Sequence, residues 1–292
     1  MKRFLTYLLA AFLLCSCSAA RYASGPLSRD IEARTGHRGI LRAVSYPSSE
    51  PKLSERRMVV YLPEEYDQDT LTRYPVLYLL HGARGNEVTW IDSADVCRRI
   101  DSLRMEELVK DFIVVLPNMN NYYGDRDYRN GHAINATRAF WTLNGEAERY
   151  FMRDVVMRTD SLFRTVPQKE GRAIAGMSSG GLQALYLAAT NPDVFDYIGL
   201  FSPYRYPTFA TWGHRDIYGA LWPRLEVQFS DPPELYAIYI GKADFLRSHV
   251  RSFERRMTRK GYRHSFTLSA GGHEWNNWAD YFTDFCTKVF SR

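Results

Sequence analysis

Short, continuous apolar runs recur along this chain and constrain its fold more than any other feature. Because they lack the polar alternation of a strand with one solvated face, they are typical of strands buried on both faces of a parallel sheet. A helical stretch from about Ser93 to Lys110 separates the first two runs, as a crossover between parallel strands requires. The runs cover residues 76–80, 112–116, 173–176, 197–201 and 236–240.

Further segments complete the expected fold. Gly39–Tyr46 and Arg57–Leu62 predict an antiparallel hairpin at a sheet edge, since a Pro- and Ser-rich turn joins them. Ser265–Leu268 predicts a final strand before a closing helix over Trp278–Phe290. The chain has no repeat, low-complexity tract or composition break, so we expect residues 37–292 to form one α/β domain. Its mostly parallel central sheet would hold about eight strands, with helices on both faces.

The first residues predict a signal peptide. Lys2 and Arg3 supply its basic start, and Phe4–Leu14 is apolar but too short to span a membrane stably. The sequence Leu14-Cys15-Ser16-Cys17 is similar to the bacterial lipobox, in which cleavage leaves a cysteine that is then acylated.

We expect the cleavage to precede Cys17, because Ser16 is a suitable small residue before the cut. Cleavage near Ala19-Ala20, which would remove both cysteines, is the alternative. Residues 1–16 then form a lipoprotein-type signal peptide and residues 17–36 a polar tether. The protein would be exported to the periplasm or anchored to the outer membrane, and a lipid on Cys17 would be its membrane contact.

The net charge and the cysteine content limit the classes of partner and the disulfides that we expect. Without Lys2 and Arg3 the formal net charge falls from +5 to +3, which is too mild to suggest nucleic acid. The densest basic run, Arg251–Lys260, carries apolar residues in helical phase and predicts an amphipathic helix with a solvated basic face. Cys97 and Cys286 either pair or form two separately buried thiols.

The sequence Gly176-Met177-Ser178-Ser179-Gly180 fits the G-x-S-x-G pattern, in which a nucleophilic serine lies on a sharp strand-to-helix turn. An apolar run precedes it, and apolar residues at helical spacing follow it until Asn191-Pro192. The glycines would let strand and helix crowd the serine without Cβ clashes. The Ser179 N–H, at the helix start, would face the oxyanion formed when Ser178 attacks a carbonyl. A glycine-rich turn with a helix-capping serine is the alternative.

In an open α/β sheet, reactive groups belong at the carboxyl ends of the strands. Asp244 lies four residues after Ile240, and His273 lies five residues after Leu268 in a Gly-Gly-His turn. Serine, then acid, then histidine is the chain order of α/β-hydrolases. Taken alone, Asp244 could cap a helix and His273 could be structural. Their joint placement favours a catalytic set with Ser178.

Competing residues fit these roles less well. His264 is at the beginning of its strand, and His249 falls inside the predicted basic helix. A zinc site built on His273 and Glu274 would need a second histidine where the chain has Asn277. We therefore expect no metal and no organic cofactor.

A second donor to the oxyanion is expected in the turn after residue 80. Gly82 would let the backbone approach so that the N–H of Ala83 can face that of Ser179. For His81, we favour a structural role in this turn over a chemical one.

Together these motifs resemble the esterase D family of α/β-hydrolases, which includes tributyrin, feruloyl and acetyl-xylan esterases, S-formylglutathione hydrolases and mycolyltransferases. The resemblance implies Ser178 as nucleophile, Asp244 as acid, His273 as base, and the N–H groups of Ala83 and Ser179 as oxyanion donors. Met177 and Ser179 replace the leucine and methionine of many members, which changes the floor of the pocket. The resemblance spans residues 39–290 and rests on Val60–Pro63, Tyr74–Gly82, Gly85-Asn86-Glu87, Trp90, Gly176–Gly181, Gly272-His273 and Trp278.

We therefore expect a serine esterase that acts on short-chain acyl esters or on carbohydrate-linked acetyl or feruloyl esters. Acyl transfer to a sugar hydroxyl and a non-catalytic binding role are the alternatives. The segment after Leu116 should overhang the site. Its aromatic residues would suit the binding of a sugar or an aromatic ester. The alternative interpretation is a packed loop with exposed tyrosines. The partner would be a small-molecule or oligosaccharide ester, and the oligomeric state stays open. The candidate substrate-binding residues are Tyr122, Tyr123, Trp141 and Trp275.

Overall fold

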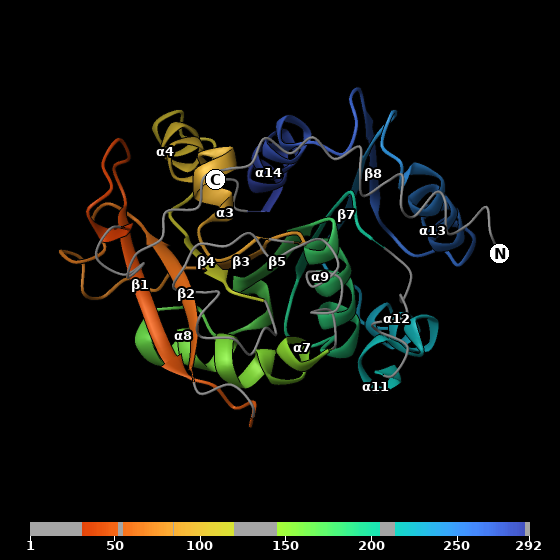
Figure 1. Ribbon diagram of the computed structural model, residues 1–292, viewed down its shortest axis with the longest axis horizontal. Coiled ribbons are helices and arrows are strands. Elements are labelled where there is room, and N and C mark those ends of the chain that lie inside the picture. The colour runs from red at the N-terminus through yellow and green to blue at the C-terminus, as the bar shows by residue number, and fades with distance from the viewer. Residues whose placement is uncertain (1–30, 52–54, 84, 120–144, 205–213, 290–292) are drawn as a thin grey trace.

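The described residues form one sheet of eight strands, in the order β1-β2-β4-β3-β5-β6-β7-β8 (Figure 1). The computed structural model describes residues 31–51, 55–83, 85–119, 145–204 and 214–289. Antiparallel pairing joins β1 to β2 and β2 to β4, and every other neighbouring pair is parallel. The expected mostly parallel sheet with an antiparallel hairpin at its edge is confirmed. The strands are β1 (Ile40–Pro47), β2 (Glu55–Leu62), β3 (Val76–Leu80), β4 (Ile113–Pro117), β5 (Arg172–Met177), β6 (Tyr197–Phe201), β7 (Leu235–Gly241) and β8 (Ser265–Ser269).

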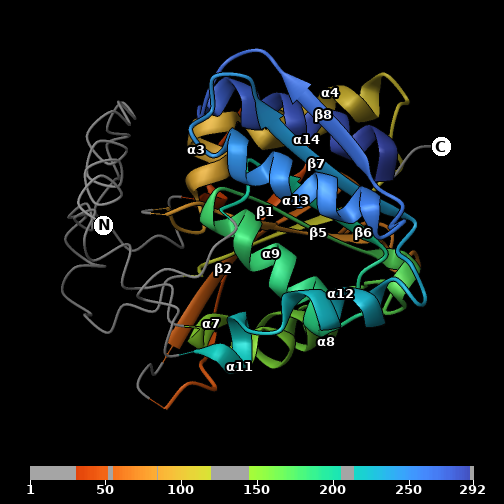
Figure 2. The same ribbon diagram turned by 90° about the vertical axis from the view of Figure 1, so that its right-hand side faces the viewer.

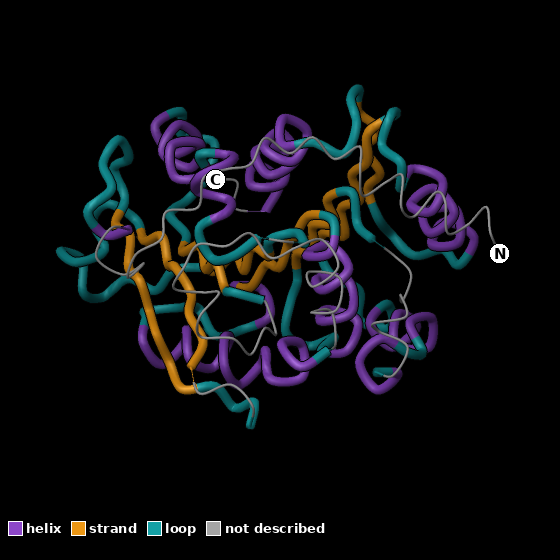
Figure 3. The backbone as a smooth tube through the Cα atoms, viewed as in Figure 1, coloured by secondary structure: helices purple, strands orange, loops and turns teal. Residues whose placement is uncertain are grey.

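Helices cover both faces of this sheet (Figures 1 and 3). One face carries α3 (Thr89–Ala94), α4 (Val96–Met105) and α14 (Trp275–Val289). Figure 2 shows the same layers from the side, with α14 and α9 on opposite sides of the sheet. The other face carries α7 (Glu146–Phe151), a π-helical turn (Met152–Val156), α8 (Met157–Leu162), α9 (Ser179–Thr190), α11 (Arg215–Tyr218), α12 (Leu221–Gln228) and α13 (Arg247–Arg259).

Burial explains why the apolar runs are strands. Every residue of β3, β4 and β5 is buried, because helices pack against both faces of the sheet centre. Alternate side chains contribute to two separate hydrophobic clusters, so that Tyr78 packs on the α9 side and Leu77 on the α14 side. The sheet therefore separates two hydrophobic cores.

The expected basic helix is α13, and its apolar residues are buried as its spacing predicts. Val250, Phe253 and Met257 face the core, while most of its arginines lie at the surface. This arrangement agrees with a solvated basic face.

The helical stretch expected over residues 93–110 is wrong in its bounds. It consists of two helices, α3 and α4, separated at Asp95, which has a left-handed backbone with φ of 49°. The second helix ends at Met105, and Glu107 again has a positive φ of 57°. Aspartate tolerates this conformation better than most residues, so the chain turns here without glycine or proline.

The packed part of the chain begins earlier than residue 37. Ile31 is buried in the core on the α14 side, and the Glu32 carboxylate accepts a hydrogen bond of 3.0 Å from the Ala43 N–H. The tether expected over residues 17–36 is therefore too long at its C-terminal end. Residues 1–30, with the expected signal peptide and Cys17, lie outside the described residues.

Cys97 and Cys286 are free thiols, and both are buried in the core on the α14 side. Burial raises the pKa of Cys97 to about 12 and that of Cys286 further above its ordinary value. Both are therefore neutral packing residues. Within the described ranges, no helix combines the length and apolar character needed to cross a membrane.

Candidate active site

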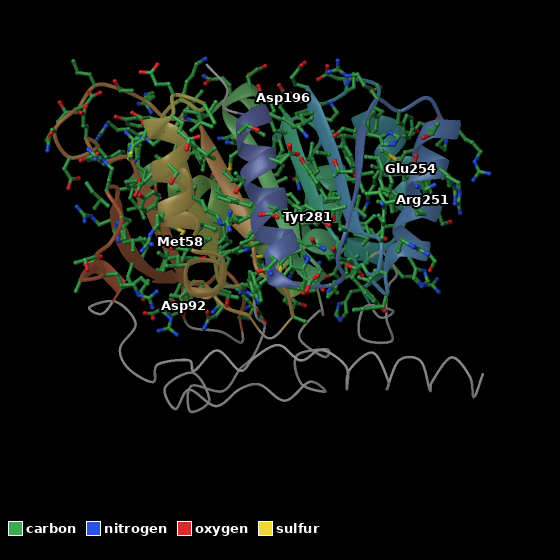
Figure 4. All side chains as sticks on the ribbon, turned by 90° about the horizontal axis from the view of Figure 1, so that it is seen from above. Met58, Asp92, Asp196, Arg251, Glu254 and Tyr281 are labelled. Atoms are coloured by element: carbon green, nitrogen blue, oxygen red, sulfur yellow. The ribbon has the colours of Figure 1, made fainter. Side chains whose placement is uncertain are left out.

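The carboxyl ends of the parallel strands lie at one edge of the sheet. Figure 4 shows Asp196, which precedes β6, and Asp92, which lies in α3 after β3, at opposite edges. The residues singled out from the sequence follow strand ends on the Asp92 edge, because each lies within five residues after its strand. Parallel strands thus bring segments far apart in the sequence to one place.

Ser178 lies between β5 and α9 in a strained backbone conformation, with φ of 54° and ψ of −115°. Two hydrogen bonds of 2.9 Å hold it there, from the Ser178 N–H to the Phe201 carbonyl and from the Tyr204 N–H to the Ser178 carbonyl. The neighbouring strand β6 and the segment that follows it therefore hold both sides of the turn.

The flanking glycines are required by close backbone approach. A Cβ at Gly176 would lie 2.5 Å from the backbone of Gly180, and a Cβ at Gly180 would lie 2.5 Å from the carbonyl oxygen of His81. Both distances are too short for any carbon atom. Strand and helix thus crowd the serine, as the sequence motif predicts, and the first turn of α9 packs directly on the end of β3.

Ser178, His273 and Asp244 form a continuous hydrogen-bonded chain. The His273 Nε2 lies 3.0 Å from the Ser178 Oγ, and its Nδ1 lies 2.9 Å from the Asp244 Oδ2. Because a carboxylate only accepts hydrogen bonds, Nδ1 carries the proton and Nε2 is left to accept from the serine hydroxyl. The three residues expected from the strand ends therefore meet in the geometry that a nucleophile, its base and an orienting acid require.

Two connected loops hold the acid and the base. The Asp244 side chain is fully buried, and its second oxygen accepts a hydrogen bond of 2.8 Å from the Leu246 N–H. The Ala243 N–H donates to the Gly271 carbonyl at 2.8 Å, which ties the loop after β7 to the loop after β8. The Glu274 carboxylate accepts a hydrogen bond of 2.8 Å from the Gly272 N–H, which holds it within the loop after β8.

The two expected oxyanion donors occupy equivalent places on neighbouring strands. Leu80 of β3 pairs with Gly176 of β5, and Ala83 and Ser179 each lie three residues further along. Ser179 is the first residue of α9, where N–H groups have no intrahelical acceptor. Gly82 approaches the residue before the nucleophile so closely that a Cβ there would lie 3.0 Å from the Met177 Cε.

His81 is buried beneath this turn and hydrogen-bonded through both ring nitrogens. Its Nδ1 lies 2.8 Å from the Gly82 carbonyl oxygen, and its Nε2 accepts a hydrogen bond of 3.0 Å from the Met119 N–H. Burial lowers the pKa of His81 to about 4, so the imidazole is neutral at physiological pH. These hydrogen bonds agree with the structural role that we expect for His81.

Residues 49–288 match the model of the family described as "Putative esterase". The chain belongs to this esterase family. The match agrees with the resemblance seen in the motifs, and it covers every residue of the hydrogen-bonded chain described above.

Among curated relatives, an "Endo-1,4-beta-xylanase/feruloyl esterase" of Xylanibacter ruminicola is 33% identical over 147 residues. The aligned region is 49% of this esterase-family chain but only 19% of that protein, so the chain spans a small part of the relative's length.

Solved structures share the fold at low sequence identity. A ferulic acid esterase superposes with a TM-score of 0.73 at 22% identity, covering 87% of this chain and 98% of that one. A ferulic acid esterase from Anaeromyces mucronatus, solved with ferulic acid, gives 0.69 at 20% identity, covering 89% and 94%. An S-formylglutathione hydrolase from Staphylococcus aureus gives 0.66 at 18% identity, covering 88% and 98%. The α/β-hydrolase fold of this family member is therefore shown.

Two aromatic rings lie beside His273 in this member of the esterase family. Trp278 lies edge-on to His273 with ring centroids 4.8 Å apart, and Phe245 lies 4.6 Å from it on the loop after β7. Phe245 is 52% exposed although it is a large apolar residue. Sequence reasoning missed it, and its position directly after Asp244 was the available signal.

The remaining candidates divide by position. Trp275 is half-buried and packs between Trp278 and Trp90, with ring centroids 5.1 and 5.4 Å away. Trp278 in turn contacts His273. His264 bonds the Tyr262 carbonyl at the start of β8 and is not part of the site. The candidates Tyr122, Tyr123 and Trp141 lie outside the described residues.

Proposed function

We propose that this protein is a serine esterase that hydrolyses carboxylic esters through an acyl-enzyme on Ser178. The observation that carries the proposal is the hydrogen-bonded chain from Ser178 through His273 to the buried Asp244. Membership of an esterase family supports the same reaction class.

In the first step, the Ser178 Oγ attacks the ester carbonyl carbon while its proton moves to the His273 Nε2. The carbonyl electron pair becomes an oxyanion, which the N–H groups of Ala83 and Ser179 stabilise. When the oxyanion collapses, the bond from carbon to the alcohol oxygen breaks, and His273 returns the proton to that oxygen. The alcohol leaves and the acyl group stays on the serine.

In the second step, water replaces the alcohol. His273 takes a proton from the water as its oxygen attacks the acyl carbon, and the same N–H groups stabilise the second oxyanion. Its collapse releases the carboxylic acid, and the proton returns to the Ser178 Oγ. Asp244 stabilises the imidazolium in both steps and keeps the proton on Nδ1.

For the substrate, we infer an acetyl or feruloyl ester, including esters carried on a carbohydrate. This inference draws on the feruloyl esterase named in the curated relative and on the ferulic acid esterases among the structural neighbours. Neither acyl transfer to sugars nor a non-catalytic binding role is favoured by these relatives.

Substitution of the serine tests the proposal. We expect wild-type protein to cleave p-nitrophenyl acetate and to be labelled by a fluorophosphonate probe, and Ser178→Ala to lose both. Ser161→Ala is the matched control, because its hydroxyl is exposed on α8 and bonds only a local carbonyl. Parental hydrolysis by Ser178→Ala would sink the proposal.

A substrate panel tests the acyl group. Methyl ferulate, methyl acetate and the corresponding arabinose or xylose esters would be compared by kcat/KM. Preference for long-chain acyl esters, with no turnover of feruloyl or acetyl esters, would contradict the substrate inference but leave the serine mechanism intact.

We also infer export with a lipid on Cys17, which rests on the lipobox-like sequence. Cells fed an alkyne-labelled fatty acid should label the wild-type protein and not the Cys17→Ala variant. Equal labelling of both would refute the anchor.

A further inference from the structure

We propose that His81 is a positioning residue that sets the Gly82–Ala83 peptide plane and thereby aims the Ala83 N–H at the oxyanion. The inference rests on the proposed function, because it concerns how the oxyanion donor of that reaction is held. His81 does not touch the reacting atoms in this account and exchanges no proton with substrate.

The hydrogen bonds of His81 determine its tautomer. The Met119 N–H donates to Nε2 at 3.0 Å, so Nε2 carries no proton. The neutral ring must then be protonated at Nδ1, which donates to the Gly82 carbonyl oxygen at 2.8 Å. Both partners are backbone groups, which makes the ring a bridge between two main-chain segments.

The bond to Gly82 fixes the orientation of the next N–H. Peptide bonds among the described residues are all trans, so the Ala83 N–H points opposite to the Gly82 carbonyl. That carbonyl also accepts a hydrogen bond of 3.1 Å from the Gly85 N–H. Two donors therefore hold the oxygen inside the turn, and the N–H of the exposed Ala83 is directed outward.

The Met119 end of the bridge is itself anchored. Met119 is buried two residues after β4, and Asn118 before it donates its N–H to the Arg57 carbonyl on β2 at 2.9 Å. The Asn118 side-chain amide donates to the buried Glu87 carboxylate. His81 thus ties the oxyanion turn after β3 to a segment held by the neighbouring strands β4 and β2.

The ring of His81 is closely packed. A Cβ at Gly85 would lie 3.0 Å from both the Cβ and the Nδ1 of His81, so the chain closes against the ring. His81 is 4% exposed, so water cannot replace its two partners freely.

Two variants separate the two bonds. Asn at position 81 places an amide donor where Nδ1 was and keeps the bond to Gly82. Gln reaches the Nε2 position and keeps the Met119 contact, but it loses the donor to Gly82. We expect His81→Gln to lower kcat/KM about 10²-fold with little change in KM, since a misaligned oxyanion donor weakens only the transition state. His81→Asn should retain most of kcat.

A transition-state analogue gives a readout that a merely structural role would not move. A trifluoromethyl ketone adds reversibly to Ser178, and its oxygen becomes an oxyanion facing the same N–H groups. For His81→Gln, the inhibition constant should rise by the factor by which kcat/KM falls. His264→Gln is the matched control, because that Nδ1 also bonds a backbone carbonyl, at 2.7 Å, outside the site.

Unchanged kcat/KM and inhibition constant in His81→Gln would overturn the proposal, and so would equal losses in His81→Gln and His81→Asn. Should neither variant fold, nitrogen-15 NMR of the wild-type protein decides: a proton on Nε2 of His81 contradicts the Met119 bond, and a proton on Nδ1 supports it. Hydrolysis surviving in Ser178→Ala would refute the proposed function instead, so the two failures are distinguishable.

Discussion

His81 and His273 both follow strand ends at the same edge of the sheet, and both use their two ring nitrogens, yet their partners differ. His81 lies between a backbone carbonyl and a backbone N–H. His273 lies between a carboxylate and a serine hydroxyl. A backbone amide does not exchange its proton on the time scale of a reaction, whereas a hydroxyl activated by an imidazole can. The partners therefore suit His81 to the proposed positioning role and His273 to the proposed proton transfer.

The surroundings of the two rings reinforce this division. The Gly82 carbonyl and the backbone of Gly85 lie close to His81, while aromatic rings and the half-buried Ser178 border His273. A ring with substrate on one side needs room there, and a ring that braces a turn needs none. In the proposed mechanism, the same type of side chain therefore holds a turn after β3 and transfers a proton after β8.

Replacing His273 should have the largest effect. We expect His273→Ala to lower kcat by on the order of 10⁴- to 10⁶-fold, because no other group takes the serine proton. Steady-state hydrolysis of p-nitrophenyl acetate measures the loss. His264→Ala, at a histidine outside the site whose side chain is 7% exposed, should leave kcat within a small factor of wild type. Wild-type turnover by His273→Ala would show that His273 does not transfer the proton, and the proposed difference between the two histidines would be wrong.

Replacing the partner of His273 should come next. Asp244→Asn should lower kcat by about 10⁴-fold, since an amide can donate to Nδ1 and so favour the wrong tautomer. Asp280→Asn, an exposed carboxylate with side-chain exposure of 75%, is the control. A loss confined to KM would show that Asp244 shapes binding and not the imidazole.

The burial of His81 should make the free energy of unfolding depend on pH in the acid range. Its pKa is lowered from 6.5 to about 4 by burial, so between these values the unfolded chain binds a proton that the folded one does not. The stabilising contribution is fully present above pH 6.5 and is lost as pH falls toward 4. From pH 7 to pH 5 the loss should be about 2 kcal/mol.

Urea unfolding at the two pH values, compared between wild type and His81→Gln, isolates this contribution. The variant should lose about 2 kcal/mol less between pH 7 and pH 5, since Gln does not titrate. Identical pH dependence in both proteins would mean that His81 is protonated in the folded state.

The smallest expected effect concerns the aromatic border of His273. The departing alcohol must lie beside His273 when it receives its proton, and Phe245 is an exposed ring in contact with that histidine. Phe245→Ala should raise KM for esters of bulky alcohols by about 2- to 10-fold and leave methyl esters nearly unchanged. Leu71→Ala, at a side chain that is 90% exposed, is the control. An equal rise of KM for both ester types would show that Phe245 does not contact the alcohol part of the substrate.

The strands could be predicted within one or two residues because burial on both faces leaves continuous apolar runs. The break at Asp95 could not, since a left-handed aspartate has no distinctive sequence signal and glycine or proline is absent there. Secondary structure was therefore most predictable where packing alone selects it.

For the site, the order of residues and the strand ends were enough to bring Ser178, Asp244 and His273 together. The partners of His81 were not predictable, because Met119 follows another strand, β4, and donates through its backbone, which any residue type could do. Residues that act through their side chains can be recognised by residue type, whereas most main-chain hydrogen bonds cannot be predicted from residue type.

The crowding of Gly176 and Gly180 has a consequence for directed evolution. A saturation library should return glycine alone at these two positions, because any Cβ would meet main-chain atoms at 2.5 Å. Ala83, by contrast, is exposed and is proposed to act only through its N–H, so its side chain is open to variation. Phe245 is equally accessible. Substrate preference in this chain can therefore be reshaped from the outer rim while the turn that holds the nucleophile stays unaltered.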